Sequence, residues 1–233
     1  MTCFMHLPTN ALPADPLGQR LRDRRRVKRA ILASLATAAL LCAVYLLQGH
    51  FDAMPWTVGP HALSGLAGIL TAPLLHGSPE HLIANVLALL ALGTLAGTVY
   101  PRATLRTIPL AWFGSGIAAW LLGEPGSHHL GASGVAQGLA YLVVSLALLR
   151  RDRASVAAAM IALTFSGGLL VAVLPHDPTV SWQSHLGGAL AGILAAFLFR
   201  HSDPAPPRHR YSWEMEEDAA TLSADDPSHP SSR

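Results

Sequence analysis

The chain carries little charge. Only 13% of its 233 residues are Asp, Glu, Lys or Arg, whereas soluble domains contain about 25% charged residues. Hydrophobic residues make up 51%, which excludes an ordinary soluble domain and predicts a membrane protein. The formal net charge of +2 is too small to indicate nucleic acid as a partner.

Cysteine is also scarce, and a cleavable leader is not expected. Cys3 lies in the N-terminal segment and Cys42 inside an apolar run, so neither predicts a disulfide or a metal site. Residues 1–29 are polar and end in a basic run. Because they precede the first apolar segment, the N-terminus does not have the pattern of a secretory signal peptide.

Six apolar segments are each close to the 20 residues that a membrane-spanning helix needs. They cover about 30–48, 81–99, 107–122, 131–149, 155–174 and 184–199, and turn or charge signals separate most of them. The long connection 49–80 contains an apolar, Gly-rich stretch at 62–70. This stretch is too short to span comfortably and predicts an interfacial or partly inserted loop.

The predicted fold is therefore an all-α membrane protein, a six-helix bundle with a partly inserted first outer loop. We expect a cytoplasmic basic segment over residues 1–29 and a membrane domain over 30–200. Residues 201–233 are Pro-rich and then acidic, which predicts a disordered tail.

Basic residues are confined to one side of this topology. All sixteen Lys and Arg lie in 1–29, 100–106, 150–154 and 200–233, and the connections 49–80, 123–130 and 175–183 contain none. Cytoplasmic loops carry the excess of Lys and Arg. We therefore expect a multi-pass protein of a bacterial inner (plasma) membrane with both termini cytoplasmic. The basic run 20–29 is then a topological anchor.

Three spans begin on the predicted outer side with chemically capable side chains. Ser133 opens one of them within the run Gly131-Ala132-Ser133-Gly134, and His185 lies one turn into the last span. His81 and Asn85 are four residues apart at the start of a third span, so they share a helix face. Polar groups inside a membrane are costly and usually face a bundle interior or a wet cavity.

Nucleophilic catalysis suits these residues. Serine needs a base that accepts its proton, and an imidazole can serve. Ser133 would be the nucleophile and His185 the base, with Asn85, His81 and the Ser133 amide as oxyanion donors. No Asp or Glu lies within any predicted span, which predicts a Ser-His dyad without a third carboxylate.

Each of these residues also has a structural interpretation. Small residues such as Ser and Gly are enriched where membrane helices touch, and an Asn can form an interhelical hydrogen bond. A histidine at a helix end can lie at the headgroup level. The four-residue pairs Gly134 with Gly138 and Gly188 with Gly192 predict close helix contacts that could bring the Ser133 and His185 helices together.

Three motifs resemble those of the rhomboid intramembrane serine proteases: His-x-x-x-Asn in the second span, Gly-x-Ser-Gly opening the fourth, and a His near a Gly in the sixth. They correspond to the run from His76 to Asn85, the Gly131–Gly134 box and the His185-Leu186-Gly187-Gly188 run. The resemblance covers about residues 30–200 and implies cleavage of other membrane proteins at or near their transmembrane segments, without a cofactor.

The resemblance also implies roles for individual residues. Ser133 would be the nucleophile, His185 the general base, and Asn85 and His81 part of the oxyanion site. The supporting residues would be Gly131, Gly134, Gly188 and the structural histidine His76.

The sequence departs from the family pattern at two places. Many members carry a Trp-Arg pair in the first outer loop, which the region around Ala67-Gly68 lacks. A tyrosine often lies four residues after the serine, where this chain has Gln137; the nearest tyrosine is Tyr141.

Three other interpretations compete with the protease. Zinc would use histidines near the outer face, but no His-Glu-x-x-His occurs; the candidates are His76, His81, His128, His129, His176 and His185. A transporter or channel would usually show broken helices or internal repeats with charges near the midplane. An inactive rhomboid-like binding protein or chaperone would typically lack the Ser or the His. The expected partners are transmembrane substrates and the lipid bilayer, not nucleic acid.

Overall fold

The structure, a computed structural model, describes residues 16–175 and 180–203. Within these ranges the long elements are helices: α1 (Pro16–Leu47), α3 (Pro79–Val99), α4 (Pro101–Leu122), α5 (Ser133–Arg150), α6 (Arg153–Val171) and α7 (Trp182–Phe199). Among the described residues, an isolated β-bridge pairs Val58 with His129. The prediction of an all-α bundle is confirmed.

Five of the described helices, α1, α3, α4, α5 and α7, are long and apolar enough to cross a membrane. The remaining expected span, 155–174, coincides with α6, which is apolar over residues 153–164. The chain is a multi-pass membrane protein.

Two helices begin more than two residues earlier than the hydropathy pattern predicts. α1 starts at Pro16, not at residue 30, and its 32 residues include the whole basic run. Arg, Lys, Gln and Leu are good helix formers, so charge ends the apolar pattern without ending the helix. At 1.5 Å per residue, α1 is about 48 Å long, longer than a bilayer core is thick. α4 starts at Pro101, not at 107, because proline suits the first turn of a helix.

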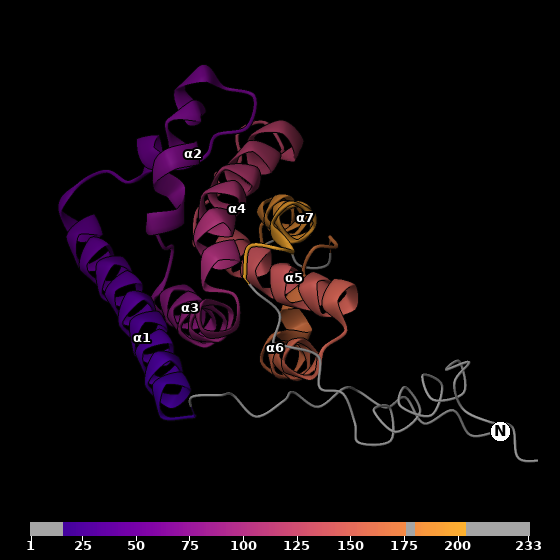
Figure 1. Cartoon of the computed structure of the whole chain (residues 1–233). Helices are drawn as coiled ribbons and strands as arrows, with labels where there is room; N and C mark the ends of the chain where they lie inside the picture. The colour runs from indigo at the N-terminus through magenta and orange to yellow at the C-terminus, as the bar shows by residue number, and fades with distance from the viewer. Residues whose placement is uncertain (1–15, 176–179, 204–233) are drawn as a thin grey trace, which may run out of the picture.

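α7 packs between α4 and α5, while α1 packs on α3 and α6 packs on α5 (Figure 1). Glycines make the contacts between α5 and α7 possible. A Cβ atom on Gly188 would overlap the Gly134 carbonyl, and one on Gly192 would overlap the Gly138 carbonyl. The predicted role of these glycine pairs in helix contact is confirmed, and it brings the first turns of α5 and α7 together.

The first loop is a chain of short turns, as its Gly and Pro content favours. They are η1 (Gln48–His50), η2 (Met54–Trp56), η3 (Leu63–Leu66), α2 (Gly68–Thr71) and η4 (Ala72–Leu74). Two indole groups of α4 hold the loop: Trp112 Nε1 donates to the Leu70 carbonyl at 3.1 Å, and Trp120 Nε1 donates to that of Ala62 at 3.0 Å. Leu63 is 83% exposed, so apolar side chains point away from the bundle.

The segment after α7 is fixed at the opposite end of the bundle from Ser133. Asp203 is buried, and its carboxylate accepts from the backbone amides of Arg102 at 3.1 Å and Ala103 at 3.0 Å. It thereby caps the first turn of α4. Arg150 Nη2 donates to the Asp203 carbonyl at 2.9 Å. Residues 201–203 of the expected tail therefore belong to the folded domain; residues 204–233 lie outside the described residues.

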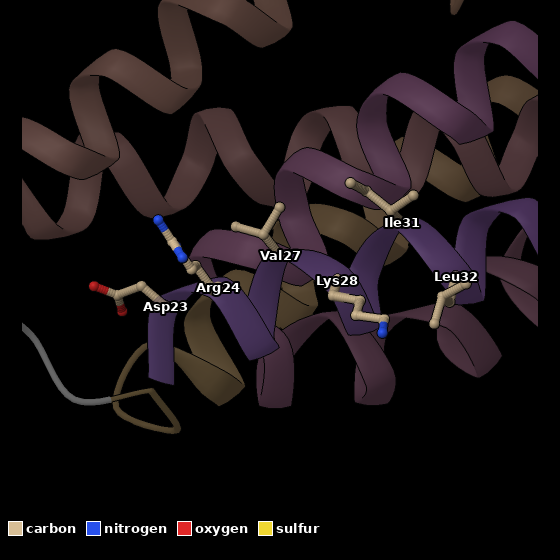
Figure 2. A pocket seen from close by; sticks show the side chains of 6 residues that line it. All are labelled: Asp23, Arg24, Val27, Lys28, Ile31 and Leu32. Atoms are coloured by element: carbon tan, nitrogen blue, oxygen red, sulfur yellow. The ribbon is translucent and has the colours of Figure 1, made fainter. Parts of the chain in front are cut away.

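A shallow hollow of about 420 Å³ lies on the basic half of α1 (Figure 2). Its lining residues are Asp23, Arg24, Val27, Lys28, Ile31 and Leu32. All belong to one helix and none to the three sequence motifs, so this hollow is a surface feature separate from the candidate site.

Candidate active site

Ser133 is the first residue of α5 and is half-buried. The turn before it depends on Gly131, whose φ of +111° lies in the left-handed region that glycine tolerates. The Gly131 amide donates to the Ala72 carbonyl at 2.9 Å, which ties the turn to the first loop. Although the Val135 amide donates to the Ala132 carbonyl at 3.0 Å, the amides of Ser133 and Gly134 precede the first intrahelical hydrogen bonds. They are available as donors beside the serine hydroxyl.

α3 presents His81 and Asn85 to the same turn. Ser78 caps this helix by accepting from the His81 amide at 3.2 Å. A Cβ atom on Gly131 would lie 2.6 Å from His81 Nε2 and 3.4 Å from Asn85 Nδ2, so only a glycine allows this approach. Asn85 is buried, and its Nδ2 has no hydrogen-bond partner among the described residues. A buried amide donor therefore lies at the turn before Ser133.

His185 lies one turn inside α7 and is 6% exposed. Its Nδ1 is 3.0 Å from the Ala172 carbonyl oxygen. Since a carbonyl can only accept, Nδ1 carries the hydrogen, and Nε2 is the basic nitrogen of the neutral ring. A backbone carbonyl thus orients this imidazole in the way that a carboxylate does in a triad.

The Ser133 and His185 helices touch next to these two residues. Gly134 follows Ser133 and Ser184 precedes His185; a Cβ atom on Gly134 would lie 2.9 Å from the Ser184 carbonyl oxygen. Membrane helices approach this closely where glycine leaves the backbone bare. The starts of α3, α5 and α7 therefore converge, as the sequence motifs predict.

His76 lies behind His81. It is 1% exposed, and its ring contacts the His81 ring edge-on with centroids 5.2 Å apart. Gln48 holds its backbone: the His76 amide donates to Gln48 Oε1 at 2.9 Å, and Gln48 Nε2 donates to the His76 carbonyl at 3.0 Å. Burial, and then the neighbouring His81, lower the pKa of His76 to about 4. His76 is therefore neutral and supports the ring of His81.

Three features of the site have surroundings that the sequence motifs do not predict. The Ala172 carbonyl is a backbone group, which any residue could supply. Gln137, at the position where rhomboids often have tyrosine, is fully buried within α5. His129 and Ser181 form a hydrogen bond between the two helix starts, although sequence alone links His129 only to the zinc interpretation.

Metal binding receives no support from the described histidines. In residues 16–175 and 180–203, no three His, Cys, Asp or Glu side chains gather where they could hold a metal ion. His176, one of the candidate zinc ligands, lies outside the described residues.

Fold and site together define a multi-pass helical membrane protein in which the segments that carry Ser133, His185, His81 and Asn85 meet at the starts of three helices. The family model of the Rhomboid domain matches residues 63–202, which is more than half of the chain. The chain belongs to the rhomboid family.

Proteins of mycobacteria are similar to part of this chain. Uncharacterized proteins of Mycobacterium tuberculosis and Mycobacterium bovis are each 37% identical over 150 residues, which cover 60% of this chain and 62% of the relative. An uncharacterized protein of Mycobacterium leprae is 37% identical over 142 residues, 57% of this chain and 56% of the relative. The chain thus matches about three fifths of the length of these relatives.

Proposed function

We propose that this chain is an intramembrane serine endopeptidase that hydrolyses peptide bonds in or near the transmembrane segments of other membrane proteins. Ser133 is the nucleophile and His185 the general base. Asn85, His81 and the Ser133 amide stabilise the oxyanion. The observation that carries the proposal is the contact of Gly131 with His81 and Asn85, because it sets a buried amide donor against the turn that presents Ser133.

In the first step Ser133 Oγ bonds to the scissile carbonyl carbon while its proton passes to His185 Nε2. The bond from Nδ1 to the Ala172 carbonyl keeps Nε2 as the accepting nitrogen. The carbonyl oxygen becomes an oxyanion, which the donors from α3 and α5 stabilise.

Collapse of this intermediate breaks the carbon–nitrogen bond, and His185 gives its proton to the leaving amine. Water then attacks the acyl ester, with His185 again as the base, and releases the carboxylate product and Ser133. No cofactor enters either half-reaction.

We further propose an orientation of the chain in the membrane. Both termini are cytoplasmic and Ser133 faces the outer side of a bacterial inner membrane, because the segments on the opposite side hold all sixteen Lys and Arg. A substrate helix must expose its scissile carbonyl, and backbone groups in lipid are otherwise satisfied within the helix. Small or helix-breaking residues near the scissile bond would therefore favour cleavage.

Labelling with a fluorophosphonate probe tests the activated serine. We expect the purified chain to be labelled at Ser133, with peptide mass spectrometry locating the adduct, and Ser133→Ala and His185→Ala to abolish labelling. A folded wild type that stays unlabelled in lipid as well as in detergent would favour an inactive rhomboid-like binding protein or chaperone. An adduct on another serine would contradict the assignment of Ser133.

A further inference from the structure

A buried hydrogen bond joins the loop before Ser133 to the start of α7. His129 is 8% exposed, and its Nδ1 lies 2.7 Å from Ser181 Oγ. Ser181 is the N-cap residue of α7 and accepts from the Ser184 amide at 3.3 Å. His129 precedes Ser133 by four residues, and Ser181 precedes His185 by four. One contact thus connects the segments that carry both proposed catalytic side chains.

The protons of this contact can be assigned from its neighbours. Ser127 Oγ donates its single hydrogen to the Glu124 carbonyl at 2.7 Å, so it accepts from His129 Nε2 at 3.0 Å. Burial, and then the adjacent His128, lower the pKa of His129, which favours the neutral ring. With its hydrogen on Nε2, the neutral ring accepts at Nδ1 from the Ser181 hydroxyl. Ser181 Oγ also lies 2.9 Å from Ser184 Oγ; since each hydroxyl has one hydrogen, Ser184 is the donor in that contact.

The backbone of His129 is itself held in place. Its amide donates to the Val58 carbonyl at 3.0 Å, and its carbonyl accepts from the Val58 amide at 2.9 Å. Beside it, His128 Nδ1 lies 2.8 Å from Thr57 Oγ1. The first loop thus fixes the backbone of His129, and the His129 ring in turn bonds to the first residue before α7. A fixed histidine can therefore hold the start of α7 in place.

Two of the contacts that restrain the first turn of α7 lie at different positions. One is the backbone contact between Gly134 and Ser184; the other is the side-chain bond between His129 and Ser181. The packing of α7 against α4 and α5 fixes the axis of the helix, and the side-chain bond at Ser181 adds a restraint at the residue where the helix starts. A displacement of about 1 Å between reacting groups can reduce a rate by about 100-fold.

We infer that His129 is a positioning residue, which acts through its hydrogen bond to Ser181 to hold the first turn of α7, and therefore His185, in register with Ser133. The catalytic part of this inference rests on the proposed function. The structural part, the restraint of α7 by His129, does not.

Two substitutions of His129 separate its two hydrogen bonds. An Asn side chain places a polar atom where Nδ1 lies, and a Gln side chain places one where Nε2 lies. His129→Asn therefore keeps the acceptor for Ser181 and loses the donor to Ser127, while His129→Gln does the reverse. Ser181→Ala removes the same bond from the other side.

We expect His129→Gln and Ser181→Ala each to slow fluorophosphonate labelling about 10- to 100-fold. Ser181→Ala also removes the cap to the Ser184 amide, so the double variant should be no slower than Ser181→Ala alone, because the His129–Ser181 bond is already lost. His129→Asn should stay close to the wild-type rate. With a cleavable substrate, the loss should fall on kcat and leave KM unchanged. His61→Asn is the control, because it removes a histidine hydrogen bond in which α7 takes no part: the bond between His61 Nε2 and the Gly123 carbonyl at 3.1 Å.

Hydrogen exchange at residues 182–190 gives a readout that needs no activity. His129→Gln and Ser181→Ala should speed exchange there, and His129→Asn should not. If the wild type proves unreactive, the protease proposal fails while hydrogen exchange still decides the restraint. Equal labelling and exchange in the Gln and Asn variants, or unchanged values in both, would overturn the inference.

Discussion

Gly131→Ala perturbs the contact on which the proposed site depends. A Cβ atom at this position would lie 2.6 Å from His81 Nε2, against about 3.4 Å for ordinary contact. The His81 ring and the turn before Ser133 must therefore separate by about 0.8 Å, the difference between the two distances. Overpacking of this kind costs about 1–3 kcal/mol, and the strained positive φ of the alanine adds about 1–3 kcal/mol.

Gly126→Ala provides a matched control. Gly126 also has a positive φ, +84°, but an added Cβ atom meets nothing within 4 Å. Both variants carry backbone strain, and only Gly131→Ala disturbs His81. We expect Gly131→Ala to slow fluorophosphonate labelling about 10- to 100-fold and Gly126→Ala to label at close to the wild-type rate. Equal labelling rates in the two variants, with both folded by thermal melting, would refute the reasoning.

Three further predictions concern single side chains. Asn85→Ala should slow substrate cleavage about 100- to 1,000-fold through the loss of an oxyanion donor, without lowering the melting temperature, because Nδ2 has no partner among the described residues. Asp203→Ala should lower the free energy of unfolding by about 1–2 kcal/mol, measured by denaturant titration, since the first amides of α4 lose their acceptor. His76 stays neutral in the folded chain to about pH 4 but is protonated below about pH 6.5 when unfolded. Stability should therefore fall by up to about 3 kcal/mol as the pH drops through this window, and His76→Leu should flatten the melting temperature–pH curve.

The membrane helices could be predicted from sequence because hydropathy reports what a lipid environment requires. It could not report the true starts of α1 and α4, since the basic residues that end the apolar pattern are good helix formers. The glycine pairs of α5 and α7 were also predictable, because a four-residue spacing places them on one helix face.

The candidate site likewise has residues that the sequence predicts and contacts that it does not. Its motif residues form local patterns, so the sequence alone is enough to single out His81, Asn85 and Ser133. The contacts that orient them are not local. His129 and Ser181 lie 52 residues apart, Asp203 caps a helix 100 residues earlier in the chain, and the Ala172 carbonyl belongs to the backbone. Only tertiary packing brings such groups together.

Cleavage of a single-span reporter protein in proteoliposomes is the decisive test of intramembrane proteolysis by this chain. We expect the wild-type chain to produce two fragments whose new termini, identified by mass spectrometry, lie in or near the transmembrane segment of the reporter. Ser133→Ala and His185→Ala, reconstituted at the same density, should produce none. If the folded wild type leaves intact every reporter in a panel with helix-breaking residues in the span, or if Ser133→Ala produces the same fragments, the account is contradicted.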